Sequence, residues 1–241
     1  MNEQQARNLK INGIGQSAGG TYGKISTDGI ATLNGDTDCV SLTSNGTLKL
    51  KGSARAQEFR MNGKASAEGP LYGKKLRIDG MLNIAGDLRV EQNDINGILT
   101  ITGSASGERM EIDGSMKLEG SAEFETFKVH GGFQIGEMLN AGTLDIYMAG
   151  ACRAKEIGGE RIQVRRKASA RSLLAFLSPA LAVRLTADVI EGDDIRLEET
   201  KADVVRGNSV IIGPGCEIGR VEYRHRYEAD PSASVGRAEQ V

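Results

Sequence analysis

Hydrophobic residues recur along this chain in pairs, and one residue separates the two members of each pair. The pairs return every 17 residues over roughly the first two thirds of the chain. Positions two residues apart point to the same face of a β-strand, so each pair predicts a short strand with one buried face. The clearest pair forms two columns at this spacing. The first column contains Ala31, Leu48, Ala65, Leu82, Leu99, Met116 and Phe133, and the second contains Leu33, Leu50, Ala67, Ile84, Ile101, Leu118 and Ile135.

Two more pairs of columns follow within each repeat. One pair contains Leu42, Phe59, Leu76, Asn93, Met110, Phe127 and Leu144, then Met61, Ile78, Ile95, Ile112, Val129 and Ile146. A weaker pair contains Ala54, Leu71, Leu88, Ala105, Ala122 and Leu139, then Cys39, Ala56, Val90 and Phe124. Three inward faces per repeat describe one triangular coil of a β-helix. The predicted fold class is therefore all-β, a parallel solenoid with coils of 17 residues.

Glycine marks the corners of the predicted coils. Two ladders run at the 17-residue spacing. The first contains Gly29, Gly46, Gly63, Gly80, Gly97, Gly114 and Gly131, and the second contains Gly35, Gly52, Gly69, Gly86, Gly103 and Gly120. Asn or Asp precedes several glycines of the first ladder, as in Asn45-Gly46 and Asp79-Gly80, and such pairs favour turns that need positive φ.

Stacked coils lie about 4.8 Å apart, so equivalent side chains contact their copies one level away. The alternative is a sandwich of β-hairpins, because Asn-Gly and Asp-Gly also favour hairpin turns. Hairpins, however, do not require equal columns at one spacing. The first repeat is one residue shorter, since Leu9 and Gly13 stand 16 residues before Ile25 and Gly29. The predicted core is centred on Leu48, Leu82, Leu99, Leu50, Ile84, Ile101, Ile78 and Ile112.

The period divides the chain into four parts. Residues 1–164 are predicted to form the regular coils, and residues 165–186 form a basic and apolar interruption with a helix or loop near 165–184. Residues 187–223 are expected to form further coils, and residues 224–241 a disordered polar tail. The first boundary rests on Ile162 and Val164, which continue the register after a one-residue insertion. The return of coils rests on a 17-residue spacing, shared by Ala187, Val204 and Val221 and by Ile195 and Ile212.

Composition and charge argue against several classes of function. The chain of 241 residues carries a net charge of −2, which gives no basis for nucleic-acid binding by bulk electrostatics. Cys39, Cys152 and Cys216 are far apart and predict packed, reduced thiols instead of a metal or redox site. No run approaches the roughly 18 apolar residues of a membrane span, and no secretory signal is recognised, so we expect a cytoplasmic location.

Candidate catalytic residues are few. His130 precedes a corner glycine where other repeats have Asn or Asp, and His225 lies between Arg224 and Arg226. Both positions favour a turn or solvated residue over a general acid or base. The 32 acidic residues are scattered and do not converge as in polysaccharide-cleaving β-helices. We therefore predict no catalytic, cofactor-binding or metal site, no cofactor, and no enzyme activity.

Two further segments suggest alternatives. The stretch VIIGPGCEIG from Val210 to Gly219 is similar to the hexapeptide repeat of left-handed β-helix acyltransferases, although such repeats give coils of about 18 residues. A basic and apolar cluster predicts either a membrane-surface element or a helix that covers the core or contacts a second subunit. Its residues are Arg165, Arg166, Lys167, Leu173, Leu174 and Phe176.

The glycine-punctuated coils from Leu9 to Val164 resemble the bactofilin family. The repeats GTLKLKG (46–52), LRIDG (76–80) and MEIDG (110–114) carry the resemblance. It implies a right-handed β-helix, nucleotide-independent polymerisation end to end, and a cytoskeletal or scaffold role in cell shape, envelope organisation or motility. The partners it implies are further copies of the chain, as a homopolymer or an end-to-end dimer, or a paralogous bactofilin. A peripheral location at the inner face of the cell membrane is a further expectation. The chain is longer than a typical bactofilin and carries the interruption near 165–184, which could limit polymer growth.

The ends of a solenoid give a physical reason for assembly. A terminal coil leaves unpaired backbone donors and acceptors beside an exposed core, and such an edge pairs readily unless it is blocked. The first coils, around Leu9 to Tyr22, show no long cap in the sequence. Contacts that do not close into a ring produce an open filament. We therefore expect polymerisation, or head-to-head pairs, through the end coils.

Overall fold

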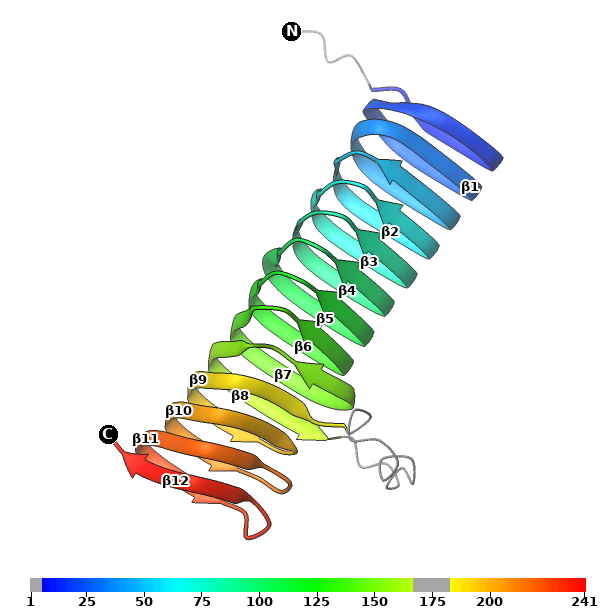
Figure 1. The fold of residues 1–241 in the computed structure, drawn as a ribbon. Helices are drawn as coiled ribbons and strands as arrows, with labels where there is room; N and C mark the ends of the chain where they lie inside the picture. The colour runs from blue at the N-terminus through cyan, green and yellow to red at the C-terminus, as the bar shows by residue number, and fades with distance from the viewer. Residues whose placement is uncertain (1–5, 167–182) are drawn as a thin grey trace, which may run out of the picture. The chain divides into compact units, whose positions relative to one another are not determined.

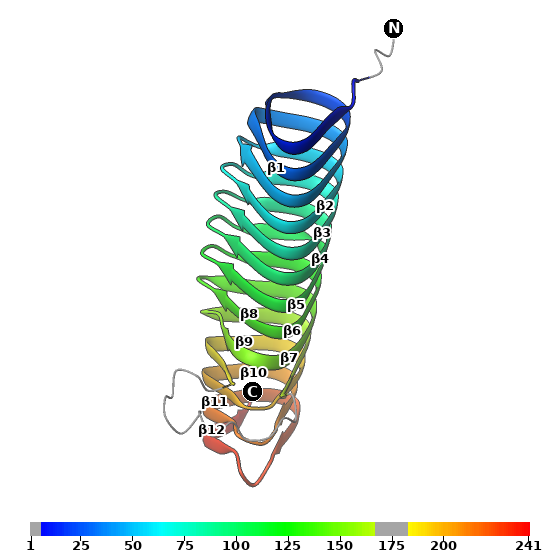
Figure 2. The same cartoon turned by 90° about the vertical axis from the view of Figure 1, so that its right-hand side faces the viewer.

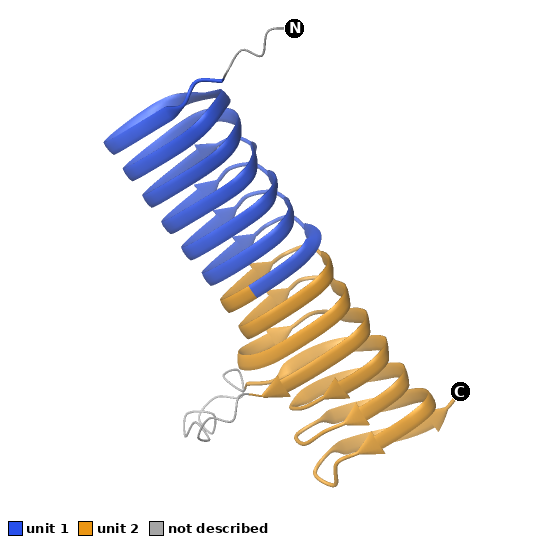
Figure 3. Ribbon diagram, turned by 180° about the vertical axis from the view of Figure 1, so that it is seen from behind, with its two compact units in different colours: residues 1–111 blue, residues 112–241 orange. Residues whose placement is uncertain are grey.

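The computed structural model describes residues 6–166 and 183–241. The chain divides into two compact units, unit 1 with residues 1–111 and unit 2 with residues 112–241 (Figure 3). In the described part of the chain every regular element is a β-strand. β5 (Ala105–Leu118) contains the boundary between the units.

Unit 1 is a stack of parallel coils. Its other strands are β1 (Leu9–Lys51), β2 (Ala54–Ala67), β3 (Leu71–Ile84) and β4 (Leu88–Ile101). Each strand bends at the corners of a coil and continues along the next side (Figures 1 and 2). Leu48 pairs with Ala65, Ala65 with Leu82, and Leu82 with Leu99, so the 17-residue register of the sequence is the register of the sheet. The β-hairpin alternative is wrong, because all of these pairings are parallel.

The predicted columns form the core. In β2 the buried residues are Ala54 and Ala56, then Phe59 and Met61, then Ala65 and Ala67, which gives three inward faces in one coil. The centre of the predicted core is confirmed, since all eight of its residues are at most 3% exposed: Leu48, Leu82, Leu99, Leu50, Ile84, Ile101, Ile78 and Ile112. Burial of these aliphatic side chains supplies the main stabilisation, because aromatic residues are only 4% of the chain.

The glycines of the first ladder have the predicted conformation, whereas Gly69 and Gly103 of the second ladder do not have a positive φ. Gly97 has a φ of 133°, and a Cβ placed on it would lie 2.0 Å from the carbonyl oxygen of Gly80 one coil away. A side chain there would meet both backbone strain and a steric clash. Positive φ is found at every glycine of the first ladder: Gly29, Gly46, Gly63, Gly80, Gly97, Gly114 and Gly131.

Unit 2 continues the same architecture within itself. Its strands are β6 (Ala122–Ile135), β7 (Met138–Arg153), β8 (Glu156–Arg166), β9 (Leu185–Leu197), β10 (Thr200–Ile212), β11 (Glu217–Ala229) and β12 (Ser234–Gln240). These strands pair with one another in parallel. Leu144 pairs with Ile162 and Ile146 with Val164, which confirms the one-residue insertion predicted for this coil.

The later coils of unit 2 do not keep the expected spacing. Ala187 pairs with Ala202, and Ile195 pairs with Val210, so these partners are 15 residues apart. Val221 pairs with Val205 and not with Val204, which makes that coil one residue longer. The expectation of 17-residue spacing here is wrong, because β9 has 13 residues where β2 has 14, and two residues connect β9 to β10 where three connect β2 to β3.

The interruption starts later than predicted. Arg165 and Arg166 belong to β8, and β9 begins at Leu185. Cys152 of β7 pairs with Leu185, and the Cys152 amide donates to the Arg184 carbonyl at 2.9 Å, so the stack resumes directly at this side of the coil. The expected helix or loop near 165–184 otherwise lies outside the described residues.

The prediction of a disordered tail at residues 224–241 is also wrong. β11 runs to Ala229, and β12 follows from Ser234 to Gln240. Ile218 pairs with Val235 and Val221 with Ala238. The reason is that a polar sequence with few large side chains can still satisfy its backbone groups by pairing with the strand before it. Together the pairings and burial confirm the all-β parallel solenoid.

Candidate functional site

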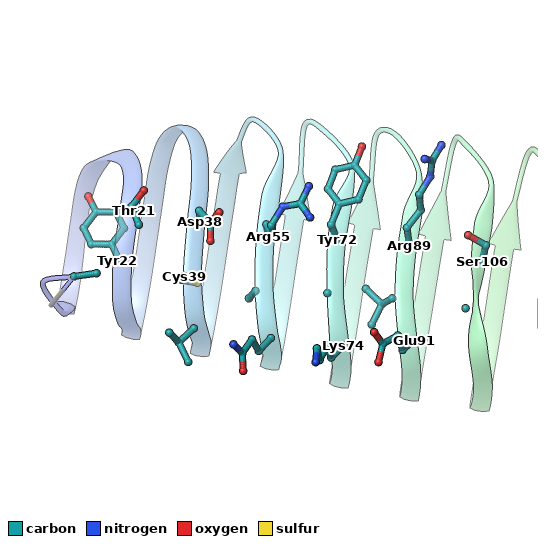
Figure 4. A pocket seen from close by; sticks show the side chains of 17 residues that line it. Thr21, Tyr22, Asp38, Cys39, Arg55, Tyr72, Lys74, Arg89, Glu91 and Ser106 are labelled. Carbon is teal, nitrogen blue, oxygen red and sulfur yellow. The ribbon is translucent and has the colours of Figure 1, made fainter. Parts of the chain in front are cut away.

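A groove runs across successive coils of unit 1. It has a volume of about 690 Å³ and extends from Tyr22 in β1 to Ser106 and Gly107 in β5 (Figure 4). The lining residues come from the same three positions of each coil. The floor contains Cys39, Ala56, Gly73, Val90 and Gly107, one wall contains Asp38, Arg55, Tyr72, Arg89 and Ser106, and the other contains Val40, Gln57, Lys74 and Glu91.

The groove floor is backbone, because the side chains of Cys39, Ala56 and Val90 point into the core and are at most 5% exposed. In register, Ala56 pairs with Gly73 and Gly73 with Val90. A Cβ on Gly73 would lie 2.3 Å from the Ala56 carbonyl oxygen, and one on Gly107 would lie 2.0 Å from that of Val90. The backbone of neighbouring coils is therefore close-packed at the floor, and a Cβ on Gly73 would also lie 3.1 Å from the Phe59 ring of the core.

One wall of the groove is basic and aromatic. Arg55, Tyr72 and Arg89 are register partners on three consecutive coils, and their side chains point to the same side in Figure 4. The Arg55 guanidinium lies over the Tyr72 ring, with Cζ 4.9 Å from the ring centroid. Arg89 donates to Asp87 at 2.9 Å, while 61% of its side chain stays exposed. In the described part of the chain Arg55 has no carboxylate partner.

The cysteines are buried and protonated. Burial raises the pKa of Cys39, at the groove floor, to about 11, and the neighbouring Asp38 carboxylate adds to the rise. Burial likewise raises the pKa of Cys152 to about 12 and that of Cys216 to about 11. All three thiols are free, which agrees with the prediction of packed, reduced cysteines. A thiol with such a pKa is a poor nucleophile at neutral pH.

The edge of the first coil is the second candidate site. β1 is the first strand in sheet order and β12 the last. Lys10 is the single charged residue between Leu9 and Tyr22, and the Ile14 side chain is 85% exposed. The edge at β12 differs, because it carries the Arg237–Glu239 ion pair and neighbours the Arg226–Glu228 pair of β11. Charged side chains at an edge oppose strand addition, and Leu9 to Tyr22 carry fewer of them than β12 and its neighbour β11.

The histidines take structural or solvent positions. His130 is at a corner in β6, where its Nδ1 lies 3.7 Å from an Asp113 oxygen and its ring lies 5.1 Å from the Tyr147 ring. His225 is exposed in β11, where the register with β10 shifts. Cys216 is buried in the acyltransferase-like stretch. Among the described residues, neither histidine is hydrogen-bonded to a cysteine, since Cys152 and Cys216 donate to backbone carbonyls.

The basic cluster is only partly described. Arg165 donates to Asp145 at 2.6 Å and lies beside the Tyr147 ring. Arg166 pairs with Glu199 at 2.9 Å. Both arginines are thus held against the solenoid by carboxylates. Lys167, Leu173, Leu174 and Phe176 lie outside the described residues.

Unit 2 has a groove of its own, with a volume of about 670 Å³. Gly159, Gly192 and Gly207 lie one above another at its floor. Arg206 lies 2.6 Å from Glu222 and 3.7 Å from Glu191, so these three charged groups pair with each other. No cluster of three or more His, Cys, Asp or Glu suited to a metal ion occurs among residues 6–166 and 183–241. The same residues contain no helix long and apolar enough to cross a membrane.

Comparisons with known proteins give two relatives, both uncharacterized proteins of Bacillus subtilis (strain 168). YhbF is 44% identical over 99 residues, which are 41% of this chain and 39% of YhbF. YhbE is 47% identical over 103 residues, which are 42% of each protein. The chain thus matches about two fifths of the length of these relatives. No protein-family model and no solved structure matches it.

Proposed function

We propose that this chain is a self-assembling scaffold protein of bactofilin type, which polymerises without nucleotide through the end coils of its β-helix. Cellular roles in cell shape, envelope organisation or motility, and a cytoplasmic location that includes the inner face of the membrane, are part of the proposal. The observation that carries it is the edge of the first coil, where Ile14 is 85% exposed and Lys10 is the single charge between Leu9 and Tyr22.

The physics of a solenoid edge supports this assembly. Each inner coil pairs its backbone with two neighbours, whereas a terminal coil pairs on one side only. Gly13 in the first coil lies directly against Gly29 of the second. A strand from another copy can therefore add to the outer side of this coil and continue the stack at about 4.8 Å. Such addition also covers part of the Ile14 side chain, which is 85% exposed whereas Ile98 on an inner coil is 44% exposed, and this gives a hydrophobic contribution.

The experiment compares assembly of the native chain with an edge variant. Ile14→Lys places a charge on the first coil, and Ile98→Lys makes the same change at an exposed position, 44% exposed, on an inner coil. We expect the native chain and Ile98→Lys to form fibres or end-to-end pairs in negative-stain micrographs at low micromolar concentration. We expect Ile14→Lys to be reduced to single particles. Single particles for all three proteins, or equal assembly of both variants, would contradict the proposal.

A further inference from the structure

We propose that the groove of unit 1 binds an extended acidic peptide segment of a partner protein, in the polyproline II conformation, with a carboxylate at every third residue. This site is separate from the self-assembly edge, because its basic section lies on β2, β3 and β4 and not on the first coil. The inference rests on the floor, the wall and the spacing of the charged groups.

The groove suits a ligand whose backbone or proline rings contact it along the whole length of the ligand. Gly73 and Gly107 leave backbone at the floor, where the neighbouring Ala56 and Val90 side chains turn into the core and are 2% and 1% exposed. Apolar contact comes instead from the Tyr72 ring on one wall and from the Val40 side chain, 50% exposed, on the other. Proline rings pack well on such groups, and recognition grooves for proline-rich segments are lined by aromatic residues.

The wall supplies charge and an aromatic ring in a fixed arrangement. The Arg55 guanidinium stacks on the Tyr72 ring, which holds it in place while its N–H groups at the edge can still donate to a carboxylate. Arg89 uses one nitrogen for Asp87 and is 61% exposed, so it retains further donors. In the same row, Asp38 precedes Arg55 and Ser106 follows Arg89, so the basic section spans the three coils between them.

Spacing selects the ligand conformation. Arg55 and Arg89 are two coils apart, which is about 9.6 Å along the stack. A polyproline II helix repeats every three residues, or about 9.3 Å, so equivalent side chains return almost in phase with the two arginines. In a β-strand, equivalent side chains return every two residues, about 6.7 Å, and do not match. The Tyr72 ring between the arginines then faces the residues between two carboxylates.

The test uses a fluorescein-labelled peptide of repeated Glu-Pro-Pro triplets and fluorescence anisotropy at low salt. We expect saturable binding in the micromolar range, lost as salt rises. The double variant Arg55→Gln/Arg89→Gln should weaken binding by at least about tenfold. The matched control is Arg60→Gln/Arg77→Gln, which removes the same charge from arginines outside the groove that are 49% and 58% exposed. This control should bind within about twofold of the native chain.

Two control peptides test separately the need for carboxylates and the need for a stiff polyproline II backbone. Repeated Gln-Pro-Pro triplets lack the carboxylates, and repeated Glu-Gly-Gly triplets keep them on a flexible chain; both should bind much more weakly. Absence of saturable Glu-Pro-Pro binding, equal binding by the groove variant, or equal binding of either control peptide would overturn the proposal. Sedimentation of the same samples reports assembly separately, so a failure of peptide binding is distinguishable from a failure of self-assembly.

Discussion

Leu82 of β3 and Leu99 of β4 are register partners on neighbouring coils, and neither side chain has any exposed surface. Their contact repeats along the column with Leu48 and Ala65. Each aliphatic residue in such a column contacts its equivalents in the coils on either side. Removal of one side chain therefore affects both neighbouring levels.

Truncation of one column residue tests this packing. Leu82→Ala should lower the free energy of unfolding by about 2–5 kcal/mol, because a cavity remains between the coils on either side. Met81→Ala changes the adjacent residue, which is 43% exposed, and should cost less than about 0.5 kcal/mol. Urea unfolding followed by circular dichroism measures both. Similar costs for the two variants would contradict the inward orientation of Leu82.

The corner geometry predicts a large effect from one added methyl group. Gly97→Ala should destabilise by more than about 2 kcal/mol, because the new Cβ needs a strained φ and lies 2.0 Å from the Gly80 carbonyl oxygen. Gly150→Ala is the control, since its Cβ would meet nothing closer than 3.7 Å and its φ is not positive. Thermal unfolding compares the two. Equal melting temperatures would argue against the close approach of the corner glycines.

A buried polar pair in β1 gives a double-mutant test. The Thr27 hydroxyl donates to the Ser44 hydroxyl at 2.8 Å, and both residues are at most 2% exposed. Ser44→Ala should cost about 1–3 kcal/mol, because the Thr27 hydroxyl stays buried without that acceptor. Adding Thr27→Val should restore most of this stability. Additive losses in a denaturant series would show that the two hydroxyl groups do not interact.

The buried thiols predict how the stability of the fold depends on pH. Burial raises the pKa of Cys39 and Cys216 to about 11 and of Cys152 to about 12, above the ordinary value of 9.0. As the pH rises above about 9, the thiols of the unfolded chain ionise, whereas those of the folded chain stay protonated up to about pH 11–12. The stability that the raised pKa values contribute at lower pH is therefore lost over this range. We expect slow reaction with a disulfide reagent at pH 8 and a falling melting temperature above pH 9. Rapid labelling of the native chain at pH 8 would contradict this burial.

Much of the fold could be predicted because one spacing governs the sequence of unit 1. The columns around Leu48 and Ile78 fix which side chains point inward, and the corner glycines fix where the chain turns. The same method failed in the later coils of unit 2, from β9 onward. Ala187, Val204 and Val221 share a 17-residue spacing by coincidence, while Ala187 actually pairs with Ala202. Corner length is set by local turn geometry, and a short corner without glycine leaves no sequence signal.

The groove was missed for a different reason. Its floor residues Ala56 and Gly73 belong to the weakest pair of columns, where small residues weaken the hydrophobic pattern. The signal that could have revealed it is the outward row of Arg55, Tyr72 and Arg89 at 17-residue spacing beside those small residues. Charged outward positions are normally solvated, so the row became informative only once its neighbours were known to leave a hollow.

The proposed assembly adds copies of this chain coil to coil at the exposed edge of β1, and cryo-electron microscopy of the assembled protein can test it. The first coil of one copy should stack on an end coil of the next, with the spacing of about 4.8 Å continuing across the junction. Assemblies joined through the sides of their coils, or single particles at every concentration, would contradict it.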